Sequence, residues 1–151
     1  MILDDRLEFC DATSAIQAAS TTALLGDVID LGAASEDQNG GDGLYLVISV
    51  DTAFVSANNN TVAFELASDA QAAIATDGSA TQHILTQALA GPANYPAGTQ
   101  LKFELPPSVT YERYLGILMI TGAGASGITA GKINAFLTRD VGTQKAYPDA
   151  I

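Results

Sequence analysis

Apolar and polar residues alternate with a period of two along much of the chain. Four segments show this alternation cleanly: residues 44–50, 61–67, 101–105 and 132–138. Successive side chains of a strand point to opposite faces, so each segment predicts a β-strand with one buried face. Residues 114–120 are apolar on both faces, which is typical of a strand covered on both sides. Weaker strand candidates lie at residues 27–31 and 82–89.

Turn-forming residues separate these predicted strands. Asn, Gly and Pro gather in five places: residues 39–43, 58–60, 92–98, 106–107 and 122–127. Seven or eight short strands with turns at this spacing predict an all-β fold, an antiparallel two-sheet β-sandwich with little helix. The jelly roll is the favoured form of that sandwich. Residues 68–76 are the one helix candidate, with one or two turns and Ser68 as the N-cap.

Both ends of the chain depart from the strand pattern. Residues 10–25 are rich in Ala, Ser and Thr, and residues 140–151 carry isolated apolar side chains. We expect a single jelly-roll domain over residues 1–151. Residues 1–25 are predicted to form an N-terminal arm and a first short strand, and residues 140–151 a C-terminal tail. The two ends are interpreted either as mobile termini or as arms that order against a neighbouring subunit.

Length and charge narrow the classes of function. The chain has 151 residues, enough for one domain, and 48% are apolar while 15% are charged, which excludes a disordered chain. Its 6 basic and 17 acidic residues give a net charge of −11, which argues against nucleic acid as a partner. The longest apolar run, residues 115–120, is far shorter than the roughly 20 residues of a membrane helix. Acidic residues near the start argue against a secretory signal, so we expect a soluble protein without classical export.

Residues 122–127, Gly-Ala-Gly-Ala-Ser-Gly, match the spacing of the dinucleotide-binding fingerprint. That chemistry needs a helix directly afterwards, whose N-terminus holds the pyrophosphate. Another predicted strand follows instead, and the residues that remain after Gly127 are too few for a further βαβ unit. The glycines are therefore interpreted as a flexible hairpin loop.

The chain offers little material for catalysis. His83 is its one histidine and Cys10 its one cysteine, so an internal disulfide or a cysteine metal cluster has no second thiol. A lone thiol suits a reducing compartment. Asp11, beside Cys10, raises the pKa of a thiol rather than lowering it, and a lone strand histidine is usually structural. We predict no enzyme, no catalytic or metal-binding residue and no cofactor.

Residues 36–42 are rich in carboxylate and amide oxygens, which raises the question of a weak cation site. They do not follow the twelve-residue calcium loop, because Ile48 stands where that loop needs its closing Glu. Solvated turn residues are the simpler interpretation. Paired carboxylates of a glycosidase are a further alternative, but the chain has no Trp to offer a sugar platform.

Five motifs occur along the chain in an informative order. They are residues 27–32 (DVIDLG), 44–54 (LYLVISVDTAF), 60–66 (NTVAFEL), 112–115 (ERYL) and 131–137 (GKINAFL). The opening residues 1–4 (MILD) and 9–12 (FCDA) extend the pattern. Together they resemble the small jelly-roll cement, or decoration, proteins of short-tailed bacteriophage capsids, such as that of the Bordetella phage. The resemblance covers roughly residues 25–138.

The resemblance implies a noncatalytic virion protein. Such proteins bind the outside of the phage head as symmetric oligomers and clamp adjacent major capsid subunits. The implied partners are the major capsid protein and further copies of this chain, a dimer being favoured over a trimer, with neither nucleic acid nor membrane. The implied location is the outer capsid surface, after synthesis in the host cytoplasm. A β-sandwich that binds carbohydrate or a host surface is the alternative, and it requires exposed tyrosines gathered in one cleft.

Overall fold

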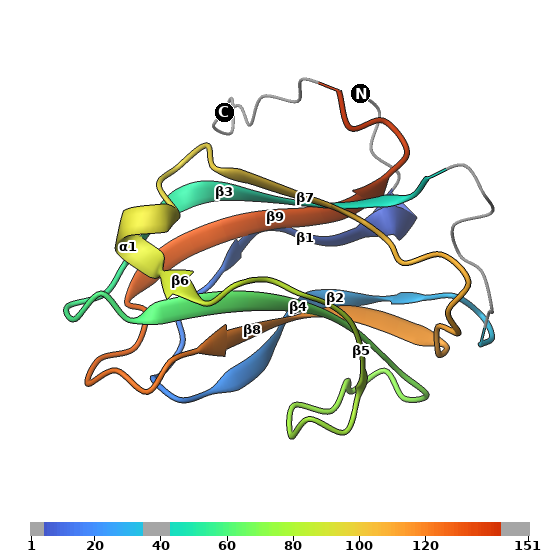
Figure 1. Cartoon of the computed structure of the whole chain (residues 1–151), viewed down its shortest axis with the longest axis horizontal. Coiled ribbons are helices and arrows are strands. Elements are labelled where there is room, and N and C mark those ends of the chain that lie inside the picture. The colour runs from blue at the N-terminus through green and yellow to red at the C-terminus, as the bar shows by residue number, and fades with distance from the viewer. Residues whose placement is uncertain (1–4, 35–42, 143–151) are drawn as a thin grey trace.

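Two antiparallel sheets pack face to face in the computed structural model, which describes residues 5–34 and 43–142 (Figure 1). The β3 sheet has the order β1 (Glu8–Ser14), β9 (Ala130–Thr138), β3 (Tyr45–Val55) and β7 (Gln100–Glu104). The β4 sheet has the order β2 (Thr22–Asp30), β8 (Tyr114–Thr121), β4 (Thr61–Asp69) and β5 (Thr81–Leu85), with β6 (Leu89–Ala90) also paired to β4. Two short helical elements, η1 (Asp5–Leu7) and α1 (Gly91–Asn94), complete the described part.

The strand order is that of a jelly roll. With the two-residue β6 set aside, the sheets have the orders first–eighth–third–sixth and second–seventh–fourth–fifth along the chain. Every connection except the one from β4 to β5 therefore crosses from one sheet to the other. This is how a jelly roll winds its two Greek keys into a sandwich. The predicted all-β, two-sheet architecture is confirmed.

The predicted strands all overlap observed ones. The five strong predictions correspond to β3, β4, β7, β8 and β9, and the weak prediction at residues 27–31 lies mostly within β2. The weak prediction at residues 82–89 is split, because β5 ends at Leu85 and β6 begins at Leu89. Between them, the Thr86 N–H donates to the Phe64 carbonyl oxygen at 2.9 Å. The chain thus stays against β4 while it changes direction.

The facing surfaces of the two sheets form the main core. Its apolar side chains come from alternate strand positions, such as Leu46 and Ile48 on β3, as the period of two predicts. At one end, the rings of Phe54, Phe64 and Tyr95 pack against one another in tilted and edge-to-face geometry, with centroids between 5.5 and 6.2 Å apart. Such dense packing makes a stiff domain.

Residues 10–25 belong to the sandwich, and the prediction that they lie in an arm is wrong. β1 pairs with β9, and β2 starts within this segment. The register of β1 shifts between Glu8 and Cys10 and again between Cys10 and Thr13. Adjacent residues Phe9 and Cys10 are consequently both buried, so the strand shows no period of two. The predicted first short strand exists, but as an edge strand of the β3 sheet.

Residues 68–76 do not form the predicted helix. Ser68 lies inside β4 and is fully buried, so it caps nothing. The segment that follows crosses the outer face of the β4 sheet, where Ile74 packs into a small second core. The Asp69 carboxylate holds this loop by accepting a hydrogen bond from the Ala75 N–H at 3.0 Å. A single buried apolar side chain anchors a loop, whereas a helix needs a repeating apolar face.

The C-terminal tail lies partly within the described residues. After β9, the carbonyl oxygens of Val141 and Gly142 accept hydrogen bonds from Lys102 Nζ at 3.2 and 3.1 Å. Three predicted segments lie outside the described residues. They are the first residues of the predicted arm (1–4), most of the tail (143–151) and the candidate cation segment (within 35–42). None of the helices in the described part has the length and apolar character to cross a bilayer.

Candidate functional site

The glycine segment at residues 122–127 crosses between the two sheets, so the hairpin prediction is wrong. β8 belongs to the β4 sheet and β9 to the β3 sheet. The Asn60 side chain holds the crossing, because its Nδ2 donates to the carbonyl oxygens of Gly122 and Ser126 at 3.0 and 2.9 Å. A Cβ at Gly127 would lie 2.2 Å from the carbonyl oxygen of Gln17. The glycines serve close packing, and β9 follows without a helix that could hold a pyrophosphate.

His83, on β5, takes part in a partly buried side-chain contact. Its ring stacks on Tyr111 with centroids 4.2 Å apart, and its Nε2 lies 2.8 Å from Ser68 Oγ. Ser68 Oγ also accepts the Glu112 N–H at 3.1 Å. Burial lowers the pKa of His83 below its ordinary value, so the ring is neutral at neutral pH. Ser68 is fully buried, whereas His83 is half-buried.

Cys10 and His83 are not brought together. Cys10 lies on β1 and His83 on β5, which are edge strands of different sheets; β1 packs beside β2, at the edge of the β4 sheet opposite β5. Burial, with smaller contributions from the charges of Glu8 and Asp11, raises the pKa of the Cys10 thiol to about 12. A thiol with that pKa is not a nucleophile at neutral pH.

A groove of about 570 Å³ runs along β1 and β2. Its charged lining residues are Arg6, Glu8, Asp11, Asp27 and Asp30. At its rim, Arg113 donates two hydrogen bonds of 2.9 Å to the Asp30 carboxylate and lowers the pKa of Asp30 to about 2. Nowhere in the described residues do three His, Cys, Asp or Glu side chains gather as metal ligands would. The groove is an acidic surface feature.

A smaller groove of about 310 Å³ lies between the outer face of the β4 sheet and the loop after β4. Glu65 lines it from the sheet and Asp77 from the loop. Burial raises the pKa of Glu65, whereas hydrogen bonds from Ser79 lower that of Asp77. Carboxylates with separated pKa values are what a glycosidase uses. The lining contains no aromatic side chain to hold a sugar, so the groove lends that alternative no support.

The tyrosines do not gather in a cleft. Tyr95 and Tyr111 are buried in the main core, while Tyr45 and Tyr114 are half-buried and lie on different sheets. Tyr147 falls outside the described residues. The described part of the chain therefore lacks the aromatic cleft that the carbohydrate-binding alternative requires.

The edges of the sheets are the remaining candidates for a functional surface. β1 and β7 flank the β3 sheet, and β2 and β5 flank the β4 sheet. The registers of β1, β2 and β5 with their neighbours each contain a shift. β7 pairs with β3 without one. The strand pattern predicted β7 as a strand, but it carried no signal that β7 lies at an edge.

Comparison with protein families identifies the chain by its sequence. The sequence profile of the Bbp16 family matches residues 13–137, which is most of the chain. The chain belongs to the Bbp16 family. Membership of this phage-related family points to a structural role in the virion. No curated protein matches the sequence of this Bbp16 family member.

Among solved structures, this Bbp16 family member is similar to a chain in the structure of infectious bursal disease virus Gx strain. The TM-score is 0.46 and the identity 15%, over 87% of this chain and 30% of that chain. A likeness this distant carries no argument about function.

Proposed function

We propose that this Bbp16 family member is a capsid cement protein. It binds the outer surface of the phage head as a homo-oligomer and clamps adjacent major capsid subunits against the outward pressure of packaged DNA. The observation that carries the proposal is the family match over residues 13–137. The proposed role is noncatalytic and requires no cofactor.

A stiff sandwich suits a clamp. Packaged DNA pushes the shell outward, and a rigid domain that bridges two subunits adds contacts that must break before the shell opens. Each contact can be weak, since an oligomer that engages several subunits at once gains affinity from its effective concentration. The two-sheet core, with its interlocked rings of Phe54, Phe64 and Tyr95, resists deformation under such a load.

The charge distribution supports a partner other than nucleic acid or membrane. The net charge is −11. The described basic residues are spread over separate elements and form no continuous strip: Arg6, Lys102, Arg113, Lys132 and Arg139. Arg113 is already paired with Asp30. A protein of this kind stays away from DNA and remains soluble until it docks on the head.

The C-terminal tail, residues 140–151, is the proposed contact with the capsid. Its start is tied to β7 by the hydrogen bonds from Lys102 to Val141 and Gly142. Further along, Tyr147 and Ile151 supply apolar side chains without a neighbouring apolar run. We expect these two apolar side chains to insert between capsid subunits.

The test is co-sedimentation of the purified protein with expanded capsids that lack it, followed by thermal release of the packaged DNA. We expect saturable binding at a fixed copy number and a higher release temperature. A chain without residues 143–151 should bind more weakly while its thermal unfolding is unchanged. Absence of saturable binding would contradict the cement role, and binding in a glycan screen would then favour the carbohydrate-binding alternative.

A further inference from the structure

β7 is the one edge strand of the described sandwich with a regular register. Edge strands expose unpaired N–H and C=O groups, and proteins usually disrupt such edges with bulges or charges. The other three edges have shifts in register, whereas Gln100–Glu104 pair with β3 in five consecutive steps. No further described strand covers the other side of β7. This edge is therefore suited to accept another strand.

The backbone hydrogen bonds show which residues of β7 face outward. The Leu105 N–H donates to the Leu44 carbonyl oxygen at 2.8 Å. Alternate residues of an antiparallel strand bond to the same neighbour. Phe103 lies two residues before Leu105, so its backbone N–H and C=O groups also point toward β3. The N–H and C=O groups of Lys102 and Glu104 point to the open edge.

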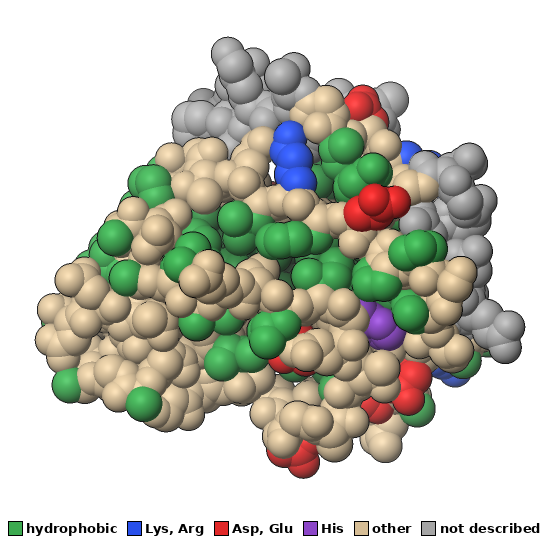
Figure 2. All heavy atoms as spheres, viewed as in Figure 1, with side chains coloured by type: hydrophobic (Ala, Val, Ile, Leu, Met, Phe, Trp, Pro, Cys, Tyr) green, Lys and Arg blue, Asp and Glu red, His purple; other side chains and the backbone are tan. Residues whose placement is uncertain are grey.

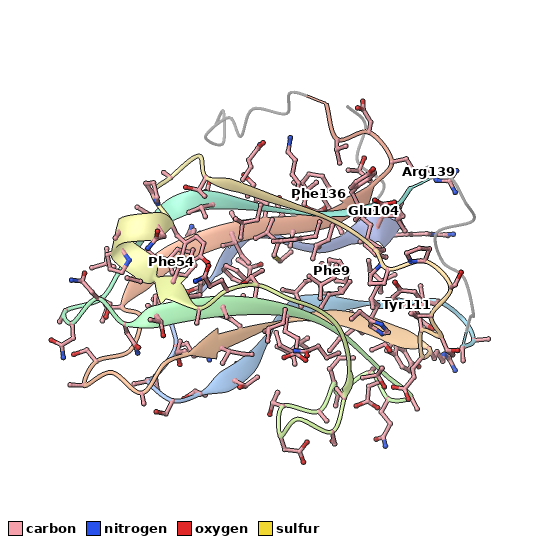
Figure 3. All side chains as sticks on the ribbon, in the orientation of Figure 1. Phe9, Phe54, Glu104, Tyr111, Phe136 and Arg139 are labelled. Atoms are coloured by element: carbon pink, nitrogen blue, oxygen red, sulfur yellow. The ribbon has the colours of Figure 1, made fainter. Side chains whose placement is uncertain are left out.

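The side chains of β7 divide into an apolar and a charged row. Lys102 and Glu104 are exposed on the outer face of the β3 sheet, and Figure 3 labels Glu104. Partly buried apolar residues on the inner side form what we call the apolar seam: Ile84, Leu89, Leu101 and Phe103. Figure 2 shows apolar side chains gathered along this side of the molecule, between the two sheets. A strand added at β7 would cover part of this seam.

We propose that two copies of this chain pair antiparallel through β7, with a two-fold axis at Phe103. In this register each Lys102 lies opposite Glu104 of the second copy, and the two Phe103 side chains lie opposite each other. The outward N–H and C=O groups of residues 102 and 104 then bond across the axis. Both charge pairs are attractive, and the aromatic pair extends the apolar seam.

Charge complementarity selects this register over its neighbours. An axis at Lys102 places the two lysines opposite each other, and an axis at Glu104 does the same with the two glutamates. An axis at Leu101 leaves Lys102 opposite Gln100, without an ion pair. Lys102 Nζ already donates to two tail carbonyls, and its third hydrogen is sufficient for the carboxylate of the second copy.

The inference rests on the homo-oligomer of the proposed function and specifies its interface. Pairing through β7 joins the two β3 sheets into one continuous sheet across the dimer. It also leaves β1, β2 and the acidic groove between them on the far sides of both copies. Those far sides and the tails remain accessible to capsid subunits.

Sedimentation of the full-length protein tests the interface without any capsid. We expect the wild type to sediment at about twice 15.5 kDa. Lys102→Glu and Glu104→Lys each turn two attractive pairs into repulsive ones and should raise the dimer dissociation constant about tenfold. The double variant Lys102→Glu/Glu104→Lys restores both pairs and should return to the wild-type constant. Lys132→Glu, an exposed change of equal charge on β9, is the matched control and should have no effect.

Hydrogen exchange supplies a second measurement at residue level. The amides of Lys102 and Glu104 should be protected in the wild-type dimer and should exchange faster in either single variant at a protein concentration between the two dissociation constants. The Phe103 amide, which bonds to β3, should be protected in all of them. A monomeric wild type, a trimer, or single variants with an unchanged dimer dissociation constant would overturn the proposal. A monomer that still binds capsids saturably would overturn this interface and leave the cement role intact. A dimer that does not bind capsids would contradict the cement role and leave this interface intact.

Discussion

The two long sides of the sandwich are built in different ways. On one side, β1 and β2 pack directly against each other. Gly26 on β2 has a φ of +68°, and a Cβ at this position would lie 2.2 Å from the Phe9 carbonyl oxygen, so no larger residue fits there. Both strands there have shifted registers and several carboxylates. On the other side, β7 has a regular register with β3. Its outer face carries one Lys and one Glu, and its inner face carries partly buried apolar residues.

The difference separates folding from association. The irregular side is closed by its own backbone, so its side chains contribute to the core and its edges discourage pairing. The regular side leaves apolar surface and hydrogen-bonding groups that a second copy can use. Substitutions on the first side should change the stability of the single chain, and those on the second should change self-association.

The largest expected effect is on the closed side. Phe9→Ala leaves a cavity at a residue that is 1% exposed and should lower the free energy of unfolding by about 3–5 kcal/mol. Phe103→Ala, at a half-buried position, should lower it by about 1–2 kcal/mol. Both are measured by urea denaturation in the Lys102→Glu background, so that association does not contribute. Equal losses would show that the two sides are closed to the same degree.

Glycine substitutions sharpen the comparison at the backbone. Gly26→Ala adds a clash with the Phe9 carbonyl to the strain of a positive φ, and it should cost about 3 kcal/mol of unfolding free energy. Gly98→Ala, just before β7, has a φ of +87° with no atom within 4 Å of the added Cβ, so it should cost about 1 kcal/mol. Thermal unfolding of the two variants measures the difference. A milder effect at Gly26 would contradict the close approach of β1 and β2.

The smallest effect is a difference in pH dependence. Burial lowers the pKa of His83 in the folded chain, so the unfolded chain binds more protons below about pH 6.5 and stability falls as the pH drops through that region. The pKa of Asp30 is lowered from 3.8 to about 2, so its contribution is present above pH 3.8 and is lost only as the pH falls toward 2.

Urea denaturation between about pH 7 and pH 5 separates the two groups. His83→Asn should flatten the fall in stability over this range, whereas Asp30→Asn should leave its slope unchanged. A slope that His83→Asn does not alter would show that His83 is not the buried neutral group.

The strands were predictable wherever the alternation was unbroken. Residues 101–105 follow the period of two because β7 keeps a regular register and exposes Lys102 and Glu104 on one face. Residues 44–50 were predicted as a strand from the same alternation, although residues 46–50 of β3 are all buried. A first short strand was expected within residues 1–25, but the position of β1 was not predicted because two register shifts bury Phe9 and Cys10 side by side. The helix predicted at residues 68–76 failed because one side chain, Ile74, anchors that loop on the outer face of the β4 sheet.

The candidate surfaces were less predictable than the strands. Asn60 looked like one residue of a polar turn, and its role in holding residues 122–127 appears only once those segments, far apart in sequence, are adjacent. The contact of His83 with Ser68 and Tyr111 has the same origin. Local patterns report which residues avoid water, but they carry no information on which distant polar groups meet.

The sequence by itself determined the all-β class, the positions of most strands and, through the order of its motifs, the resemblance to phage cement proteins. These properties are local, since a period of two and a turn residue act within a few positions of the chain. Strand order, the closure of β1 against β2 and the open edge at β7 were decided by the tertiary structure. Each depends on which strands lie side by side after the chain has crossed repeatedly between the sheets, and no short segment encodes that choice.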